Sequence, residues 1–573
     1  MTRRVWAVLL ALALSAAACQ AAVTSPRPED GPKGVRHGTL RVLDQTDVEA
    51  LDPGVAYGAA DLALLRGLVR TLYSFDSNRQ GEDALTPVPD LSSGPYQLSP
   101  DRRTYTFHIR PGVHYAQPYD ATVKAQDFVY AIRRQFAPRA RTHSPNPYAS
   151  LIKGFAEYAS GRARTISGMQ AVDDSTLRIT LREPASDFPS ILTLPFFSPV
   201  PEELAKKYRL GRDYAEHLIA SGPYALGSYV PGKLIDLVRN QNWDPQSDPL
   251  RKAWVDEVHV QVEVGATEAQ IQEAIEQGDA DLNLDLTPPP NADLERLTTD
   301  PDLRKQSAIK TTGCVRYLTL QTDSEPTSNL LVRKAVNMAV DKRALVLGIG
   351  GAFAGEPAST VLSPTLDGYQ KYPDPYGSPD SRGDPVAARA LLTQAGYPNG
   401  VPINYVGPST GKGPAILGVL RTSLERAGIR LNAKLYAGYK VYTDSLQLQS
   451  QRDQHQIGLA RWCPDVPGNG ARSFIGVLLD GRKITAKANN NYGDYNNPQV
   501  NDMIDEAYAN ADPARRNSLW GEIDRRIMDD AAWVPLVYER QAFFWSSRVR
   551  QWQFAPWISN PDVTNLWLDP NTP

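Results

Sequence analysis

The sequence predicts a mixed α/β protein with two or more lobes. Its 573 residues exceed what one hydrophobic core usually holds, so two or three domains are expected. A hydrophobic content of 42% and a charged content of 22% are typical of globular proteins. Segments that alternate with a period of two are interspersed with segments of helical period along the whole body, which favours mixed sheets and helices.

The N-terminus indicates a secretory signal. Arg3 and Arg4 precede an apolar run over residues 5–14, which is too short to span a membrane, and small residues then lead to Cys19. The stretch Ala16-Ala17-Ala18-Cys19 resembles a bacterial lipobox, in which the thiol is lipidated and becomes the mature N-terminus, although Leu is usual where Ala16 stands. The alternative is ordinary signal cleavage nearby. We expect a signal peptide over residues 1–18 and a lipid on Cys19.

The bulk composition constrains the partners. Residues 19–37 are rich in Pro and polar side chains, which predicts a flexible tether between the anchor and the body. The net charge is only -3 and basic runs are absent, so no nucleic-acid partner is expected. The 26 Tyr and 10 Trp residues suit a protein that buries or stacks on a ligand.

The first half of the body predicts strands with helices between them. Helices are expected after the extended stretch ALDPGVAY, in TVKAQDFVYAIRRQF, and in ATEAQIQEAIEQ, which Gly278 should end. In AVDDSTLRITLREP a strand pair should turn at Asp173-Asp174. The other strands are expected in residues 38–45, 103–115, 220–243 and 255–264.

Beyond residue 310 the pattern predicts a parallel α/β unit. The stretches VPINYV, ILGVLRTSLERAGI and RLNAKLY indicate a strand-helix-strand crossover. Residues 314–321 and 532–547 are predicted as strands, and residues 328–349 as one helix. A further helix should start at Pro513, with Asp512 as its N-cap.

Motifs for catalysis or cofactor binding are incomplete in this chain. GPSTGKG, residues 407–413, is one residue short of a phosphate loop, and Gly413 replaces the Ser or Thr that would hold magnesium. GIGGAFAG, residues 348–355, has Phe353 where a dinucleotide motif needs its third Gly. None of the seven His pairs at metal-ligand spacing, and no G-x-S-x-G elbow occurs. We therefore expect neither an enzyme nor a cofactor nor a metal site.

The segment Trp462-Cys463-Pro464-Asp465 admits three interpretations: a reactive thiol, a metal-ligand pair, or a pinned loop that holds Asp465 in place. With Cys19 lipidated, Cys314 and Cys463 remain as an even pair in an oxidising compartment. Their disulfide would close a long loop, worth on the order of 5 kcal/mol in the chain-entropy account. It would also fix the backbone two residues from Asp465, and a fixed carboxylate in a partly dry cleft attracts an ammonium group strongly.

Several stretches, in this order and spacing, match one family. They are ALDPGVAY, YTFHIRPGVHY with PYDATVKAQDFVYAIRR, VDDSTLRITLREPASDF, SGPYAL, VRKAVNMAVDKRAL and NYGDYNNPQVNDMIDEA. On these residues the chain resembles the extracytoplasmic solute-binding proteins of the peptide/nickel class, family 5, which deliver ligands to ABC importers. Within that family it is most similar to oligopeptide-binding lipoproteins.

The resemblance implies a ligand site around the cysteine segment. Asp465, with Trp462 beside it, would receive the free α-ammonium group of a peptide, and Cys463 would be bonded to Cys314. Arg461 stands where Gly is usual, so it would either receive a ligand carboxylate or narrow the pocket. Two prolines flank Asp465-Val466, which leaves the path of the following loop open.

Further ligand contacts are implied on both lobes. The extended segment with Ala56 and Tyr57 and the strand around Tyr317 would lie along the bound peptide and pair with its backbone. Tyr317, Trp462 and Tyr538 would form pocket walls.

The resemblance also implies a three-domain periplasmic-binding-protein-like (Venus-flytrap) α/β fold, whose two lobes close over the ligand about two connecting strands. We expect a monomer that binds oligopeptides and docks on permease subunits with cytoplasmic ATPases. The alternatives are a receptor for a nickel chelate, haem or a sugar oligomer, and a peptide-sensing signalling lipoprotein. The expected domains are domain I (38–72, 219–312 and 540–573), domain II (73–218, inserted in lobe one) and domain III (313–539, lobe two).

Overall fold

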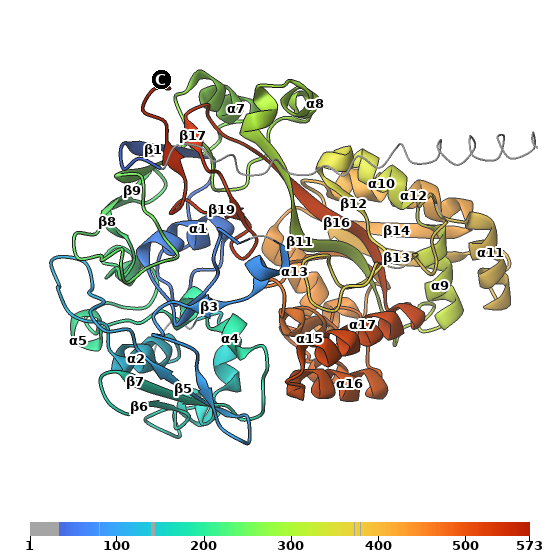
Figure 1. Ribbon diagram of the computed structural model, residues 1–573. Coiled ribbons are helices and arrows are strands. Elements are labelled where there is room, and N and C mark those ends of the chain that lie inside the picture. Colours follow the sequence, from blue (N-terminus) through green and yellow to red (C-terminus); the bar gives the residue numbers. More distant parts are fainter. Residues whose placement is uncertain (1–33, 80, 139–143, 372, 379, 573) are drawn as a thin grey trace, which may run out of the picture.

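The computed structural model describes residues 34–572 except 80, 139–143, 372 and 379. The predicted signal peptide, Cys19 and most of the tether therefore lie outside the described residues. Figure 1 shows two lobes joined by two long strands, β11 (Ser307–Leu320) and β16 (Trp533–Phe544).

The part of lobe one expected as domain I contains a four-stranded sheet of order β1-β10-β9-β8, in which β1 is parallel to β10 and the other pairs are antiparallel. Its strands are β1 (Thr39–Asp44), β8 (Tyr224–Val230), β9 (Leu234–Arg239) and β10 (Glu257–Val262). Three helices accompany it, α1 (Ala59–Leu68), α7 (Glu268–Gln277) and α8 (Asn291–Thr299), and short strand pairs are formed by β17 (Val549–Arg550), β18 (Phe554–Ala555), β19 (Asn560–Pro561) and β20 (Trp567–Leu568).

The part expected as domain II contains an antiparallel sheet of order β4-β5-β7-β6, with a further strand pair beside it. The strands are β2 (Tyr73–Ser74), β3 (Val88–Pro89), β4 (Gln97–Leu98), β5 (Thr104–His108), β6 (Met169–Ala171) and β7 (Thr176–Thr180). The helices are α2 (Ala125–Gln135), α3 (Phe155–Ala159), α4 (Phe188–Ile191), α5 (Glu202–Ala205) and α6 (Arg212–Ala215). One continuous hydrophobic cluster runs through both parts, so lobe one has a shared core.

Lobe two is built on a six-stranded sheet of order β12-β16-β11-β15-β13-β14. Its remaining strands are β12 (Gly355–Pro357), β13 (Val401–Pro408), β14 (Ile429–Tyr436) and β15 (Ile457–Trp462). One hydrophobic cluster packs α15 (Ile475–Leu478), α16 (Pro498–Ala509) and α17 (Pro513–Asp529) on one face. A second cluster packs α9 (Leu330–Ala339), α10 (Lys342–Gly348), α11 (Pro385–Gln394) and α12 (Gly413–Arg426) on the other. Helices α13 (Tyr439–Gln447) and α14 (Gln449–Arg452) complete the lobe.

The structure confirms several predicted elements. Strands β13 and β14 are parallel and α12 connects them, as the crossover pattern predicts. Helix α17 starts at Pro513, where the Asp512 side chain accepts a hydrogen bond from Ala514 N. Helix α7 is followed by Gly278 in the left-handed conformation that glycine adopts most easily.

Two predicted elements are wrong in detail. The single helix expected over residues 328–349 is two helices, because the Asp341 side chain accepts from Ala344 N and caps a new helix. The segment before α1 forms a turn and is not extended throughout, since the backbone N–H groups of Val55 and Ala56 both donate to Asp52 O. Ala56 is consequently buried in lobe one.

Candidate functional site

Asp465 lies on the loop that follows β15, at the boundary between the lobes. The Cys314–Cys463 disulfide ties this loop to β11. Ser473 fixes it on the other side, because Ser473 Oγ accepts from Asp465 N at 3.0 Å. The next residue, Val466, is buried in the hydrophobic cluster of lobe one. The loop is therefore anchored in both lobes.

Two tyrosines of lobe one reach the Asp465 carboxylate. Tyr57 Oη donates to Asp465 Oδ1, and Tyr148 Oη donates to Asp465 Oδ2. Tyr57 stands just before α1 and is 45% exposed, whereas Tyr148, from the part expected as domain II, is 4% exposed. The carboxylate thus connects lobe two to both parts of lobe one.

No Lys, Arg or His within the described ranges forms an ion pair with Asp465. Burial raises the pKa of Asp465, and the hydrogen bonds from Tyr148 and Tyr57 offset part of that rise. Burial and the neighbouring carboxylate together raise the pKa of both tyrosines, so they stay protonated donors. A half-buried carboxylate without a counter-ion can accept a cationic group, such as an ammonium.

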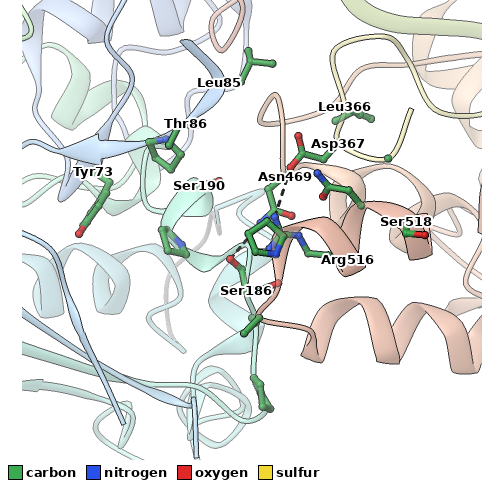
Figure 2. Close-up of a pocket in the computed structure, with 18 of the residues that line it drawn as sticks. Tyr73, Leu85, Thr86, Ser186, Ser190, Leu366, Asp367, Asn469, Arg516 and Ser518 are labelled. Carbon is green, nitrogen blue, oxygen red and sulfur yellow. Dashed lines mark hydrogen bonds and ion pairs between the residues drawn. The ribbon is translucent and has the colours of Figure 1, made fainter. Parts of the chain in front are cut away.

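Other contacts between the lobes show that they are closed on each other. Arg472 of lobe two forms a buried ion pair with Asp187 of lobe one, with Nε and Oδ2 2.6 Å apart. Asn469 Nδ2 donates to Ser186 O at 3.2 Å, which is one of the dashed lines in Figure 2.

Trp462 and Cys463 support Asp465 from behind. The half-buried Trp462 packs on the helix-covered cluster of lobe two, and its Nε1 donates to Ser473 O at 2.7 Å. Ser473 is the residue that holds Asp465 N, so Trp462 helps to position the loop. Cys463 is in the disulfide that the family resemblance implies.

Tyr317 and Tyr538 are core residues here, which corrects their assignment as pocket walls. Tyr317 is fully buried and stacks on Trp533, with ring centroids 3.5 Å apart. Tyr538 is buried, and its hydroxyl contacts Thr360 Oγ1 at 2.7 Å.

The predicted backbone pairing at Tyr317 is also wrong for this structure. Strand β11 is hydrogen-bonded to β15 on one side and to β16 on the other over this region. A strand with two partners has no free edge to offer a ligand.

Arg461 is already engaged within lobe two. Its Nε is 2.6 Å from Glu539 Oε2, and Arg316 Nε is 2.8 Å from Glu539 Oε1. Burial alone would raise the pKa of Glu539, but the Arg461 and Arg316 guanidinium groups lower it to about 2. The Lys412 ammonium also acts on Glu539, so three cations surround one carboxylate.

A cleft of about 1030 Å³ lies between lobe one, in the part expected as domain II, and lobe two (Figure 2). None of the ligand residues predicted from the sequence lines it. Tyr148 was also missed by sequence reasoning. Neither feature has a local sequence signal, because each depends on segments that are more than 170 residues apart in the chain.

One group of possible metal ligands lies on strands β9 and β10 of the four-stranded sheet in lobe one. Single ligand atoms of Asp236, Glu257 and His259 lie within 4.8 Å of one another. His259 Nδ1 is 2.7 Å from Asp236 Oδ1, and Glu257 accepts from Thr39 Oγ1, so protein partners already serve these groups. In the part of the chain that the structure describes, no helix is long and apolar enough to cross a membrane.

Relatives support a binding role. The chain is 26% identical over 490 residues to heme-binding protein A of Haemophilus influenzae, covering 82% of each chain. It is 26% identical over 528 residues to the periplasmic oligopeptide-binding protein OppA of Escherichia coli K12, covering 89% of each. Glutathione-binding proteins of Escherichia coli and Shigella also match.

Solved structures share the fold of this chain. The clavulanic acid biosynthesis oligopeptide binding protein 2 is similar with a TM-score of 0.86 and 30% identity, over 94% of this chain and 96% of that one. The peptide-bound binding protein DppA of Helicobacter pylori shares the fold, with a TM-score of 0.71 and 24% identity over 93% and 98% of the two chains. The family model of the bacterial extracellular solute-binding proteins, family 5, matches residues 86–475, more than half of the chain. The chain belongs to this family of solute-binding proteins.

Proposed function

We propose that this protein is the substrate-binding lipoprotein of an ABC importer, that it captures oligopeptides between its lobes, and that it delivers them to a membrane permease. The family and the oligopeptide-binding relatives support this. The single observation that carries the choice of peptide is Asp465, a carboxylate at the meeting point of the two lobes for which the described residues supply no counter-ion.

The chemistry at Asp465 fits the free N-terminus of a peptide. Its α-ammonium group supplies the positive charge that the carboxylate lacks, and it has three N–H donors to share between oxygen acceptors. The Tyr57 and Tyr148 hydroxyls can each accept one of these donors while they still donate to Asp465. Because the site is partly removed from water, the attraction is stronger than it would be on an open surface.

The first prediction tests this contact by replacing Asp465 with Asn, which keeps the size of the side chain and removes its charge. Calorimetric titration with short peptides should show that Asp465→Asn lowers the affinity for free N-termini by about 100-fold or more. N-terminally acetylated peptides should bind the wild type and the variant equally weakly.

Asp502→Asn is the matched control, because Asp502 is an exposed carboxylate on α16 of the same lobe. It should bind peptides as the wild type does. If acetylated and free peptides bound the wild type with the same affinity, the proposal of an ammonium anchor would be wrong.

A second candidate is a receptor for a non-peptide solute such as haem, because the haem-binding relative is as similar in sequence as the oligopeptide-binding one. Absorbance titration with haem separates the two. Tight haem binding that persists in Asp465→Asn, together with no peptide binding, would favour this second candidate.

A further inference from the structure

The cleft between domain II and lobe two has a lining that can bind a ligand. Four tyrosines and five prolines form much of its wall, namely Tyr73, Tyr96, Tyr105, Tyr369, Pro87, Pro184, Pro189, Pro364 and Pro513. Tyrosine and proline present rigid apolar surface at little entropic cost, which is what a binding wall needs.

A buried guanidinium group lies in this wall. Arg516 on α17 is 7% exposed, and its Nε has no hydrogen-bond acceptor among the described residues. The carboxylate that pairs with it is Asp367, whose Oδ2 is 3.7 Å from Arg516 NH2. Figure 2 shows Arg516 extending from α17 into the space between the two walls. A buried N–H without an acceptor is costly, so a ligand that supplies one is favoured.

The neighbouring Asn517 offers the opposite half of a hydrogen bond. It lines the cleft, and its buried Oδ1 has no donor among the described residues. Two consecutive residues of α17 in this wall therefore carry an unused donor and an unused acceptor among the described residues. A carboxylate with an amide N–H next to it would satisfy both.

We propose that the cleft is a second binding compartment, which takes a carboxylate flanked by an amide N–H. Two sources share this chemistry: the C-terminal end of a peptide whose N-terminus is at Asp465, and a separate N-acylated amino acid. The first source rests on the proposed function. It is favoured by position, because Asn469 lines the cleft and stands four residues after Asp465 on the same loop.

The experiment uses the full chain and calorimetric titration with alanine peptides of two to six residues, each with a free C-terminus or a C-terminal amide. N-acetyltyrosine is the probe for a separate solute. Arg516→Gln should weaken binding of whichever free-carboxylate probe uses the cleft by about 10- to 100-fold. It should leave the amidated peptides unchanged.

The matched control is Arg515→Gln, which alters an exposed arginine on the same helix whose partners are Glu506 and Glu522. Ser518→Trp is the second variant, because it fills the cleft with a bulky ring and keeps Arg516 in place. This variant tests the cleft even if Arg516→Gln does not fold, and it should weaken binding of the same probe.

The outcomes distinguish the sources. If only the free-carboxylate peptides bind more weakly, the cleft takes the C-terminal end of a peptide. If only N-acetyltyrosine binds more weakly, the cleft takes a separate solute. The inference is overturned if neither probe responds to Arg516→Gln or Ser518→Trp. Peptide binding that still depended on Asp465 would in that case leave the proposed function intact. If no peptide binds at all, the proposed function fails, and the N-acetyltyrosine titration decides the cleft alone.

Discussion

Two carboxylates of lobe two, Glu539 and Asp465, have opposite electrostatic environments. Glu539 is buried between two guanidinium groups, and its pKa is lowered to about 2. Asp465 accepts hydrogen bonds from two tyrosine hydroxyls of the other lobe and forms no ion pair with any described cationic residue, and burial raises its pKa. The comparison separates a carboxylate whose charge is already used inside the fold from one whose charge is available to a ligand.

The largest expected difference is in stability. Glu539→Gln leaves Arg316 and Arg461 facing each other without their carboxylate, so it should lower the free energy of unfolding by about 3 kcal/mol. Asp465→Asn removes a charge that no described residue neutralises, so the free energy of unfolding should change by no more than about 1 kcal/mol. Urea unfolding of both variants measures this. Equal losses would show that the two carboxylates do not differ in this way.

The loss of stability at acid pH gives a further test of the difference between Glu539 and Asp465. Because the folded protein holds Glu539 ionised to a pKa of about 2, its contribution is present above the ordinary value of 4.5 and is lost as the pH falls from there to 2. The difference in the free energy of unfolding between the wild type and Glu539→Gln should therefore become smaller as the pH falls through this range. A gap that stayed constant down to pH 2 would contradict the assignment.

The pH dependence of binding should show the opposite sign of shift at Asp465. A ligand ammonium favours the ionised carboxylate, so at a pH below its raised pKa a proton must leave before the peptide binds. Affinity should therefore fall, by up to about 10-fold per pH unit, as the solution is acidified through that pKa. Calorimetry at a series of pH values measures this, and Asp465→Asn should give a flat acid limb.

The sequence predicts what local periodicity encodes. The crossover from β13 to β14 and the start of α17 follow from apolar spacing and from a capping residue followed by proline, and both are in the structure. Asp465 was predicted as a ligand residue because it stands in a motif with Trp462 and Cys463. Tyr317 was misassigned because alternation tells which residues share a face of a strand, and it does not tell what covers that face. Here Trp533 covers it.

What the sequence could not predict depends on distant segments. Tyr148 meets Asp465 across 317 residues of chain, and the walls of the cleft come from two lobes. Neither of these contacts produces a pattern in a short stretch of sequence. The turn at Asp52 is a smaller case, since the carboxylate of this residue accepts from Arg134, more than 80 residues away.

The smallest expected effect compares the two tyrosines that meet Asp465. Tyr148→Phe removes the hydrogen-bond donor of one carboxylate oxygen. Because Tyr148 is buried, water cannot readily replace that donor, and peptide affinity should fall by about 10-fold. Tyr57 is 45% exposed as a residue, against 4% for Tyr148, so water can replace its hydroxyl more readily, and Tyr57→Phe should change affinity by less than about 3-fold. Calorimetry with a free-amine peptide measures both variants. Tighter binding by either variant would mean that the hydroxyl competes with the ammonium group for Asp465 instead of assisting it.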